Sequence, residues 1–521
     1  MEFVYGGGLF LNLKNMLAGL AARYGDKAAI VCEEQQLSYS GLDEASNRVA
    51  NALIGMGINK GDRIVLLLNN SPEYIVTYFG IVKIGAVAVP IDPKYKIDEL
   101  SALFADCEPR ILVADSPVLE PLIPVLSDFK SIERVIDLSS KYTGPILTYK
   151  EIMASNSAQA VKIEPDADDV ANISYTAGPS FHPKGSALTH RGIEAEAVVS
   201  AEGFGMTDKD VVLLFALPLH HSAGLIIVLL TTLSRGSTVV MLSGISMTAL
   251  TRTIEEKKVT VFIGVPFIFS LLLRGVEEEG LKHDISSLRL CAGGGSAVSL
   301  ELTQKFQQRF GYTIAQFWGL TEATAHVTCQ LLDGRDKPGS VGPLLRGWEI
   351  RAVDENGREL PPNQEGELLL RGLMMKEYYH NPKATAEAIK DGWLYTGDIG
   401  RVDEEHNVFI TGRKKDMIII KGQNIWPGDI ESVLLRYPRV AEAAVLGTPD
   451  ELRGEIIVAA IVLKPGANAT EPEVKKFCLD HLANYKVPKQ FLFVESLPKT
   501  AAGKIDKESL RLRLSLPPVF P

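Results

Sequence analysis

Short apolar runs that alternate with segments of helical periodicity constrain the fold of this chain most. Arg63–Leu68 and Gly85–Pro90 are apolar runs of strand length, and Pro72–Lys83 between them has the spacing of a helix. The same alternation returns at Val259–Val265 and Leu288–Ser296. Apolar strands that are joined by helices form parallel sheets covered on both faces. The sequence therefore predicts an α/β fold, in which a large N-terminal domain holds parallel-type sheets covered by helices.

Length and a change of pattern predict a second domain. At 521 residues the chain exceeds what a single core usually supports. From 336 to about 413, short strands and Gly/Pro turns replace the alternation, which predicts a β-rich subdomain with a turn at Gly392–Gly400. The charged segment Gly412–Asp416 is expected to be an exposed linker. We therefore expect a large domain over residues 1–413 and a small α+β domain over residues 417–521.

The composition excludes several classes of partner. The formal net charge of −10 argues against a nucleic-acid partner. Five scattered cysteines without metal spacing are typical of reduced thiols in a cytoplasmic protein, not of disulfides or zinc. Because the N-terminus has neither a basic region nor a cleavage signature, no signal peptide is expected. The longest apolar run, Ala223–Leu233, is too short to span a bilayer, so no transmembrane segment is predicted, while peripheral membrane contact stays open.

A turn that leaves an apolar strand is the first candidate for an anion site. Val170–Tyr175 reads as the strand, and the turn after it ends in Pro183-Lys184-Gly185. Such a turn exposes backbone N–H groups and one lysine to an anion above it. It is not a Walker A loop, because Pro183 precedes the lysine and Gly185 follows it. Taken alone, a surface turn with a solvated lysine explains the pattern equally well.

Seven motifs in a fixed order identify a resemblance that covers essentially the whole chain. They are YTAGPSFHPKG, LPLHHSAG, GGGSAVS, FWGLTEAT, YTGDIG, GRKKDMIIIKGQNIWP and PKTAAGKID. Together they resemble the AMP-forming acyl-CoA synthetases of the adenylate-forming superfamily, which also contains adenylation domains and luciferases. The resemblance implies a two-step reaction: a carboxylate attacks Mg²⁺-bound ATP to give acyl-AMP and pyrophosphate, and the thiol of CoA then displaces AMP. The expected small-molecule partners are therefore a carboxylic acid, ATP and CoA.

The resemblance also assigns the nucleotide site. The phosphate-loop positions are followed by those that flank or stack on adenine, an α-phosphate contact, and the carboxylate and its basic companion at the ribose. In chain order these positions are Thr176, Gly178, Ser180, Lys184, Gly294, Gly295, Ser296, Gln316, Trp318, Gly319, Thr321, Asp398 and Arg413. Without its neighbours, Asp398 fits the cap of a turn equally well.

The catalytic roles implied by the resemblance fall on both predicted domains. Glu322 matches the acid linked to Mg²⁺, and one carboxylate plus phosphate oxygens suits this ion. Lys504 matches the lysine whose ammonium bridges the carboxylate and the α-phosphate. Residues 414–416 form the hinge, with Asp416 at the position about which the small, mobile domain rotates. Lys421 and Gly422 match the segment that meets CoA.

The acyl pocket is expected to accept acids larger than acetate. Gly319 stands where the acetate-specific branch carries a blocking tryptophan, and His221 matches the histidine that gates the pocket, although His220 is an alternative. The remaining candidate wall residues are small or apolar: Ala223, Gly224, Val265 and Leu320. By elimination, the expected substrate is a medium-chain, branched, alicyclic or aromatic monocarboxylate.

The phosphate loop departs from the resemblance at Ala177, Pro179 and Phe181, where two hydroxyls and one glycine of the usual pattern are missing. Hydrogen bonds to charged groups contribute about 1.5–3 kcal/mol each, so the loss of two predicts nucleotide binding weaker by at least about tenfold. Slower adenylation and a reaction that runs near equilibrium in both directions are both open. Two other functions also remain open, namely loading of a carrier protein and nucleotide binding with weak activity.

Overall fold

The computed structural model describes residues 12–139, 141, 146–175, 183–242, 244, 246–296, 298–331, 336–416, 418–420, 423–425, 427–450, 454–482, 486–500 and 503–516. The chain divides into two compact units. The first unit contains Met1–Asp336, Gly342–Glu349 and Leu370–Leu394, and the second contains Lys337–Val341, Ile350–Leu369 and Tyr395–Pro521. The division predicted at residues 414–416 stays a prediction.

The first sheet of the first unit has the strand order β15–β14–β13–β12–β10–β11–β1–β2. Its inner strands run parallel, and antiparallel pairs close both edges. The strands are β1 (Ala28–Cys32), β2 (Gln35–Ser38), β10 (Val211–Phe215), β11 (Thr238–Leu242), β12 (Val261–Gly264), β13 (Leu290–Gly293), β14 (Ile314–Trp318) and β15 (Thr328–Cys329). The predicted parallel-type sheet covered by helices is confirmed.

A second sheet of the same unit has the order β18–β9–β8–β4–β3–β5–β6–β7. Its strands are β3 (Arg63–Leu67), β4 (Val87–Pro90), β5 (Ile111–Ala114), β6 (Arg134–Asp137), β7 (Ile146–Thr148), β8 (Val170–Tyr175), β9 (Gly185–Thr189) and β18 (Glu377–Tyr378). Both β8–β9 and β9–β18 are antiparallel, so a short strand from far downstream forms the edge of this sheet.

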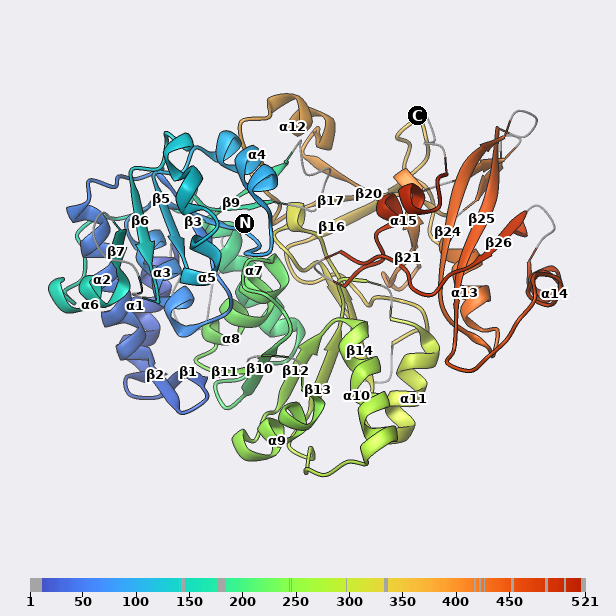
Figure 1. The fold of residues 1–521 in the computed structure, drawn as a ribbon, viewed down its shortest axis with the longest axis horizontal. Coiled ribbons are helices and arrows are strands. Elements are labelled where there is room, and N and C mark those ends of the chain that lie inside the picture. Colours follow the sequence, from blue (N-terminus) through green and yellow to red (C-terminus); the bar gives the residue numbers. More distant parts are fainter. Residues whose placement is uncertain are drawn as a thin grey trace. The chain divides into compact units, whose positions relative to one another are not determined.

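A layer of helices packs between the two sheets (Figure 1). It contains α1 (Leu13–Tyr24), α2 (Tyr39–Gly55), α3 (Pro72–Lys83), α7 (His190–Gly203), the π-helix η2 (Ala223–Leu230) and α8 (Thr231–Ser234). Helix α3 shows why the sequence starts a helix there: Ser71 accepts the Tyr74 N–H and Pro72 fixes the first turn. The predicted burial of the Ala223–Leu233 run is confirmed, because every residue of Gly224–Leu230 is buried.

The outer faces of the two sheets carry further helices. On the first sheet lie α9 (Met247–Lys257), α10 (Pro266–Glu279) and α11 (Leu300–Phe310), and their core contains Leu250, Phe269 and Phe306. On the second sheet, α4 (Ile97–Cys107) packs Leu100 and Phe104 against the strands. The shorter helical segments of this unit are α5 (Ser116–Leu119), η1 (Ile123–Asp128), α6 (Tyr149–Ser155), η3 (Thr321–Ala323) and α12 (Pro382–Ala388).

The segment from Glu349 to Arg413 forms a sheet with the order β16–β17–β20–β19, and β21 pairs with β20. These strands are β16 (Glu349–Val353), β17 (Gly366–Arg371), β19 (Ile389–Lys390), β20 (Trp393–Val402) and β21 (Val408–Arg413). The predicted turn at Gly392–Gly400 is therefore wrong. Gly400 instead lets the backbone of Phe409 on β21 come close, since a Cβ on Gly400 would lie 2.2 Å from the Phe409 carbonyl oxygen.

The predicted linker at Gly412–Asp416 is also partly wrong. Gly412 and Arg413 complete β21, and only Lys414–Asp416 leave the strand, as the short helical turn η4. After it come β22 (Ile418–Ile420), β23 (Gln423–Ile425), α13 (Pro427–Leu435), β24 (Val440–Asp450), β25 (Gly454–Leu463), α14 (Glu471–His481), β26 (Gln490–Phe493) and α15 (Lys507–Arg513). The sheet order is β23–β22–β25–β24, and β26 pairs with β25, which is the α+β pattern predicted for this region.

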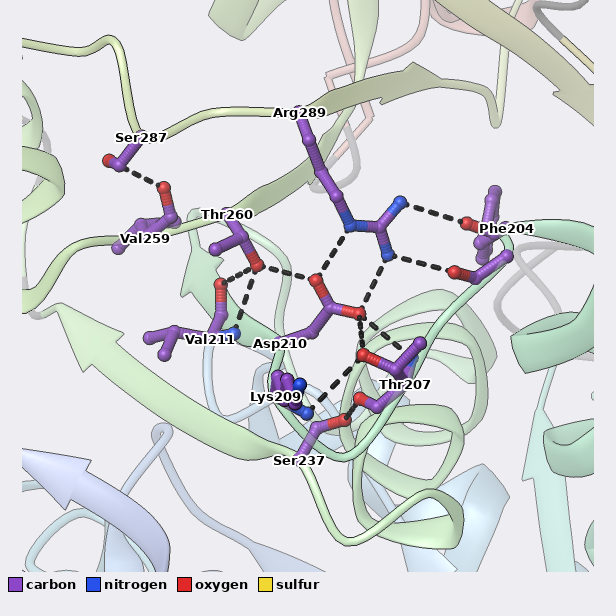
Figure 2. Close-up of polar contacts among 11 residues, drawn as sticks. Phe204, Thr207, Lys209, Asp210, Val211, Ser237, Val259, Thr260, Ser287 and Arg289 are labelled. Atoms are coloured by element: carbon purple, nitrogen blue, oxygen red, sulfur yellow. Dashed lines mark hydrogen bonds and ion pairs between the residues drawn. The ribbon is translucent and has the colours of Figure 1, made fainter.

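A polar network ties together the segments that precede the strands of the first sheet. Figure 2 shows Arg289, which comes just before β13, donating from Nε and from its terminal nitrogen to the two carboxylate oxygens of Asp210, each at 2.7 Å. Asp210 also accepts from the Thr260 hydroxyl at 2.7 Å and from the Thr207 N–H at 2.8 Å. Arg289 further donates to the carbonyl of Phe204 after α7. The network therefore joins α7 to the amino ends of β10, β12 and β13.

All five cysteines lie in the described residues, and each is a free thiol there. Among the described residues, every helix is too short or too polar to cross a membrane.

Candidate functional site

The carboxyl ends of neighbouring parallel strands in the first sheet meet at one edge, which is where ligands bind in open α/β sheets. Gly264 ends β12 beside Gly293, and Gly293 lies beside Gln316 of β14. The chain then continues from β13 into Gly294 and Gly295. A Cβ on Gly294 would lie 2.4 Å from the Phe317 ring, and Gly295 has φ +78, so both positions require glycine.

Thr321 and Glu322 lie at the tip of the β14–β15 hairpin. The Val327 N–H donates to the Trp318 carbonyl at 2.9 Å and closes the hairpin below them. A Cβ on Gly319 would lie 1.8 Å from the Ala325 carbonyl oxygen. The backbone of the same hairpin therefore occupies the place that a side chain at residue 319 would take, and the position requires glycine.

The segment that contains His220 and His221 reaches the same hairpin. Asn70 fixes it by accepting the Leu219 N–H at 2.7 Å and by donating to the Leu217 carbonyl at 2.9 Å. Ser222, which follows the two histidines, places its hydroxyl 3.3 Å from the hydroxyl of Thr321. The candidate acyl segment and the candidate phosphate contact are therefore neighbours.

His220 and His221 have different surroundings. His220 Nε2 lies 3.6 Å from the buried carboxylate of Asp92, and burial lowers the pKa of His220 although Asp92 acts in the opposite direction. His221 Nδ1 accepts the Ala223 N–H at 3.3 Å. Which of the two faces an acyl group stays a prediction.

Lys184 and Glu322 share one tyrosine. Because β18 pairs with β9, Tyr378 lies opposite Ser186, two residues after Lys184. The Tyr378 hydroxyl donates to Glu322 Oε1 at 2.8 Å, and Lys184 Nζ lies 5.4 Å from the centre of the tyrosine ring. Burial and the nearby Glu322 carboxylate raise the pKa of Tyr378, so its hydroxyl keeps the proton that it donates. A cation and a carboxylate thus both lie next to Tyr378.

In the second unit, Asp398 and Arg413 form an ion pair. They lie opposite each other on β20 and β21, and Arg413 Nε is 2.7 Å from Asp398 Oδ1. Asp398 is buried, whereas Arg413 is about half exposed. Lys504 lies in a tight turn that the Thr500 and Gly503 backbone closes, and its side chain is exposed.

The sequence comparisons identify the family. Residues 18–379 match the AMP-binding enzymes, and residues 429–504 match the C-terminal domain of AMP-binding enzymes. A long-chain-fatty-acid–CoA ligase of Bacillus subtilis is 32% identical over 96% of this chain and 94% of its own length. This chain belongs to the AMP-binding enzymes, as an AMP-forming acyl-CoA synthetase.

Another relative of the synthetase is named for a different acid. 4-Coumarate-CoA ligase 1 of Narcissus pseudonarcissus is 32% identical over 92% of this chain and 89% of its own length. The crystal structure of ATP-bound MatB from Rhodopseudomonas palustris superimposes with a TM-score of 0.89 at 30% identity, covering 96% of this chain and 99% of that one. The predicted enzyme class and the two-part fold are thereby confirmed.

The structure of the synthetase brings together several predicted residues. Gly294, Gly295, Thr321 and Glu322 lie in the turns that follow neighbouring strands of one sheet, and Gln316 lies within β14 beside Gly293. Several other predicted positions lie outside the described residues: Thr176, Ala177, Gly178, Pro179, Ser180, Phe181, Lys421 and Gly422. The individual roles of the predicted residues stay predictions.

Sequence reasoning missed Tyr378 and Ser222. Ser222 stands inside the LPLHHSAG motif and could have been found there. Tyr378 gives no local signal, because the pairing of β18 with β9 brings it next to Lys184 and Glu322 from a distant part of the sequence.

Glu322 fits a magnesium ion that also binds phosphate oxygens. Among the described residues, no group of three or more His, Cys, Asp or Glu side chains is placed to hold a metal ion. Mg²⁺ often binds one carboxylate and completes its shell with phosphate oxygens and water. The Tyr378 hydroxyl donates to Oε1 of Glu322, and this hydrogen bond orients the carboxylate.

Proposed function

We propose that this synthetase activates a monocarboxylic acid that is medium-chain, branched, alicyclic or aromatic, with ATP, to acyl-AMP and pyrophosphate, and then transfers the acyl group to CoA. The observation that carries the proposal is the convergence of Lys184, Tyr378, Glu322, Thr321 and Ser222. This convergence supports a binding site at which the phosphates of ATP lie next to Ser222, the residue that follows His220 and His221.

In this proposal, electrostatics performs the first step. Lys184 neutralises phosphate charge, and the Thr321 hydroxyl donates to the α-phosphate. Glu322 holds Mg²⁺, which neutralises pyrophosphate charge when it is bound. Lys504 joins the carboxylate to the α-phosphate, so that two anions approach at reduced repulsion. Gly294, Gly295, Ser296, Gln316 and Trp318 hold the base, and Asp398 and Arg413 hold the ribose.

The second step in this proposal uses other residues. Rotation about Asp416 replaces Lys504 by the segment of Lys421 and Gly422, which meets CoA. The same rotation, run in reverse, permits ATP formation from acyl-CoA, AMP and pyrophosphate.

Small and apolar side chains support the proposed acid. Ala223, Val265 and Leu320 are half-buried and follow the strands whose ends carry the candidate site. Val265 Cγ1 lies 3.6 Å from where a Cβ on Gly295 would be, which supports an acyl chain next to the nucleotide. The relatives named for long-chain fatty acids and for 4-coumarate support both aliphatic and aromatic candidates.

The test is CoA-dependent AMP formation across a panel of acids. The panel contains acetate, butyrate, hexanoate, octanoate, decanoate, a branched acid, cyclohexanecarboxylate, benzoate and 4-coumarate. Each buried CH₂ contributes about 0.8 kcal/mol, so kcat/KM should rise about fourfold per CH₂ until the pocket ends. A flat series from butyrate to decanoate, together with inactivity on the cyclic acids, contradicts the proposed substrate class. AMP formation without CoA consumption, in the presence of a carrier protein, would instead favour carrier loading.

A further inference from the structure

A chain of buried polar groups runs from α7 to the β14–β15 hairpin. Ser200 Oγ lies 2.8 Å from Glu196 Oε1 and 2.9 Å from His326 Nδ1. His326 Nε2 lies 3.0 Å from the carbonyl oxygen of Thr328 on β15. Each of Glu196, Ser200, His326 and Thr328 is fully buried. Buried polar groups of this kind cost free energy unless every proton has an acceptor, so the arrangement of protons along the chain is constrained.

Two proton arrangements satisfy these distances, and they carry the same number of protons. The Thr328 carbonyl only accepts, so His326 Nε2 must carry a proton. In the first arrangement, the Glu196 carboxyl donates to Ser200, and the Ser200 hydroxyl donates to a neutral His326. In the second, a cationic His326 donates to Ser200, and Ser200 donates to an anionic Glu196. The second arrangement separates two charges in a dry interior, which is the costlier state.

Burial favours the first arrangement at both ends of the chain. It raises the pKa of Glu196 to about 8, and it lowers the pKa of His326 to about 3. Of the described residues that act on the pKa of Glu196, Ser200 and Trp348 are the ones that lower it, and neither is charged. At neutral pH a neutral Glu196 therefore donates towards a neutral His326.

The hairpin next to His326 needs such an anchor. Thr324 has φ +53 and Ala325 has φ +129, so two successive residues with side chains adopt backbone angles that favour glycine. Backbone strain of this kind persists only where the surroundings fix the conformation. On one side, Thr324 donates to the Leu373 carbonyl, and on the other, His326 is fixed through both ring nitrogens and stacks 4.9 Å from the Phe204 ring. The strained turn begins two residues after Glu322.

We propose that Glu196 is a positioning residue for adenylation: as a neutral carboxyl it orders Ser200 and His326, and His326 holds the hairpin that carries Thr321 and Glu322. This inference rests on the proposed function, because it assigns the two hairpin residues to the nucleotide. Glu196 itself contacts neither substrate. Loss of its proton turns the Ser200 hydroxyl towards the carboxylate and removes the donor to His326, so the hairpin loses its order.

The test compares glutamine and alanine variants of Glu196 with the same variants of Glu194. Glu194 is a matched control, because it lies on the same helix, is buried, and has a pKa that burial raises to about 8, while its Oε1 has no hydrogen-bond partner in the described part of the chain. ATP–pyrophosphate exchange with the best acid is measured from pH 6 to pH 9.5. The denaturation midpoint is measured over pH 5 to pH 9.

Glu196→Gln should keep wild-type exchange at pH 7, because its amide donates to Ser200, and it should lack the loss of activity that the wild type shows above about pH 8. Glu196→Ala should lower kcat/KM for ATP by about tenfold, through a higher KM or a lower kcat, because small misplacements of reacting groups slow the reaction. Glu194→Ala should leave kcat/KM within about twofold. Equal effects of the two alanine variants, or an unchanged alkaline limb in Glu196→Gln, would overturn the proposal.

The denaturation series tests the proton assignment without any turnover. A glutamate whose pKa is raised by folding binds its proton in the folded state at pH values where the unfolded state has lost it, so the contribution of Glu196 to wild-type stability falls from about pH 5 to about pH 8. The denaturation midpoint of Glu196→Gln should therefore rise relative to that of the wild type between about pH 5 and about pH 8. A difference between the two midpoints that does not change with pH overturns the assignment of the proton to Glu196. If the wild type shows no exchange with any acid, the proposed function fails, and the denaturation series alone decides. Ser200→Ala replaces Glu196→Ala if that variant does not fold.

Discussion

Tyr378→Phe isolates one hydrogen bond at the candidate nucleotide site. The substitution keeps the ring beside Lys184 and the backbone pairing of β18 with β9, and it removes only the hydroxyl that donates to Glu322 at 2.8 Å. A hydrogen bond to a charged group contributes about 1.5–3 kcal/mol. Because Glu322 is partly exposed and water replaces part of the loss, we take the lower end. About 1.5 kcal/mol corresponds to about a tenfold change.

The expected result is an approximately tenfold higher KM for Mg²⁺-bound ATP, with the same preference among acids. The assay is ATP–pyrophosphate exchange as a function of Mg²⁺ at fixed ATP, together with a denaturation midpoint for each variant. Tyr379→Phe is the matched control, because this neighbouring ring stacks on His380 and the Tyr379 backbone N–H, not its side chain, bonds to Gly185. Equal Mg²⁺ dependence in wild type and Tyr378→Phe would refute the role of Tyr378 in holding Glu322.

Two further predictions concern stability and the second unit. Asp210→Ala should lower the free energy of unfolding by about 2 kcal/mol, because Arg289, the Thr207 N–H and the Thr260 hydroxyl lose their common acceptor while water reaches the half-exposed Arg289 (Figure 2). Although burial alone raises the pKa of Asp210, the bonds from Arg289, Thr207 and Thr260 outweigh it and lower the pKa. The stability that Asp210 contributes is therefore present above the ordinary pKa of aspartate and is lost as the pH falls through the lowered pKa. In urea denaturation, the difference in free energy of unfolding between wild type and Asp210→Ala should shrink below about pH 4. A difference that grows in acid would contradict this. Lys504→Ala should slow acyl-AMP synthesis by about 100-fold while thioester formation from supplied acyl-AMP continues. The control is Lys499→Ala, because the Lys499 ammonium pairs with Glu442 at 2.9 Å. Undiminished acyl-AMP synthesis in Lys504→Ala would remove Lys504 from the mechanism.

The sequence predicted the sheets well, because strands that are buried on both faces leave a direct trace. Pro72–Lys83 was predicted and observed with the same bounds, since Ser71, Pro72 and the apolar spacing all favour a helix there. The prediction was wrong where one residue type, glycine, has two structural uses, in turns and within strands. A turn was predicted at Gly392–Gly400, whereas Gly400 lies within a strand and admits the Phe409 carbonyl, and a sequence does not distinguish these two uses of glycine.

The candidate site was predictable only in part, for a similar reason. Motifs located Thr321 and Glu322, but the partner of Glu322 depends on a strand pairing between distant segments. Gly319 was predicted to leave an acyl pocket open, and this stays a prediction, because the structure shows only that the Ala325 backbone lies against this residue. Glu196 and His326 gave no motif at all, because buried polar chains assemble from segments that share no local pattern.

The pairing of β9 with β18 has a consequence for biosynthesis. Lys184 emerges from the ribosome long before Tyr378, and β9 has an unpaired edge until β18 is made. A nascent chain that ends before residue 378 therefore carries an open strand edge, which invites pairing with other chains. Translational pausing in that interval should make this synthetase a client of chaperones that shield exposed strands.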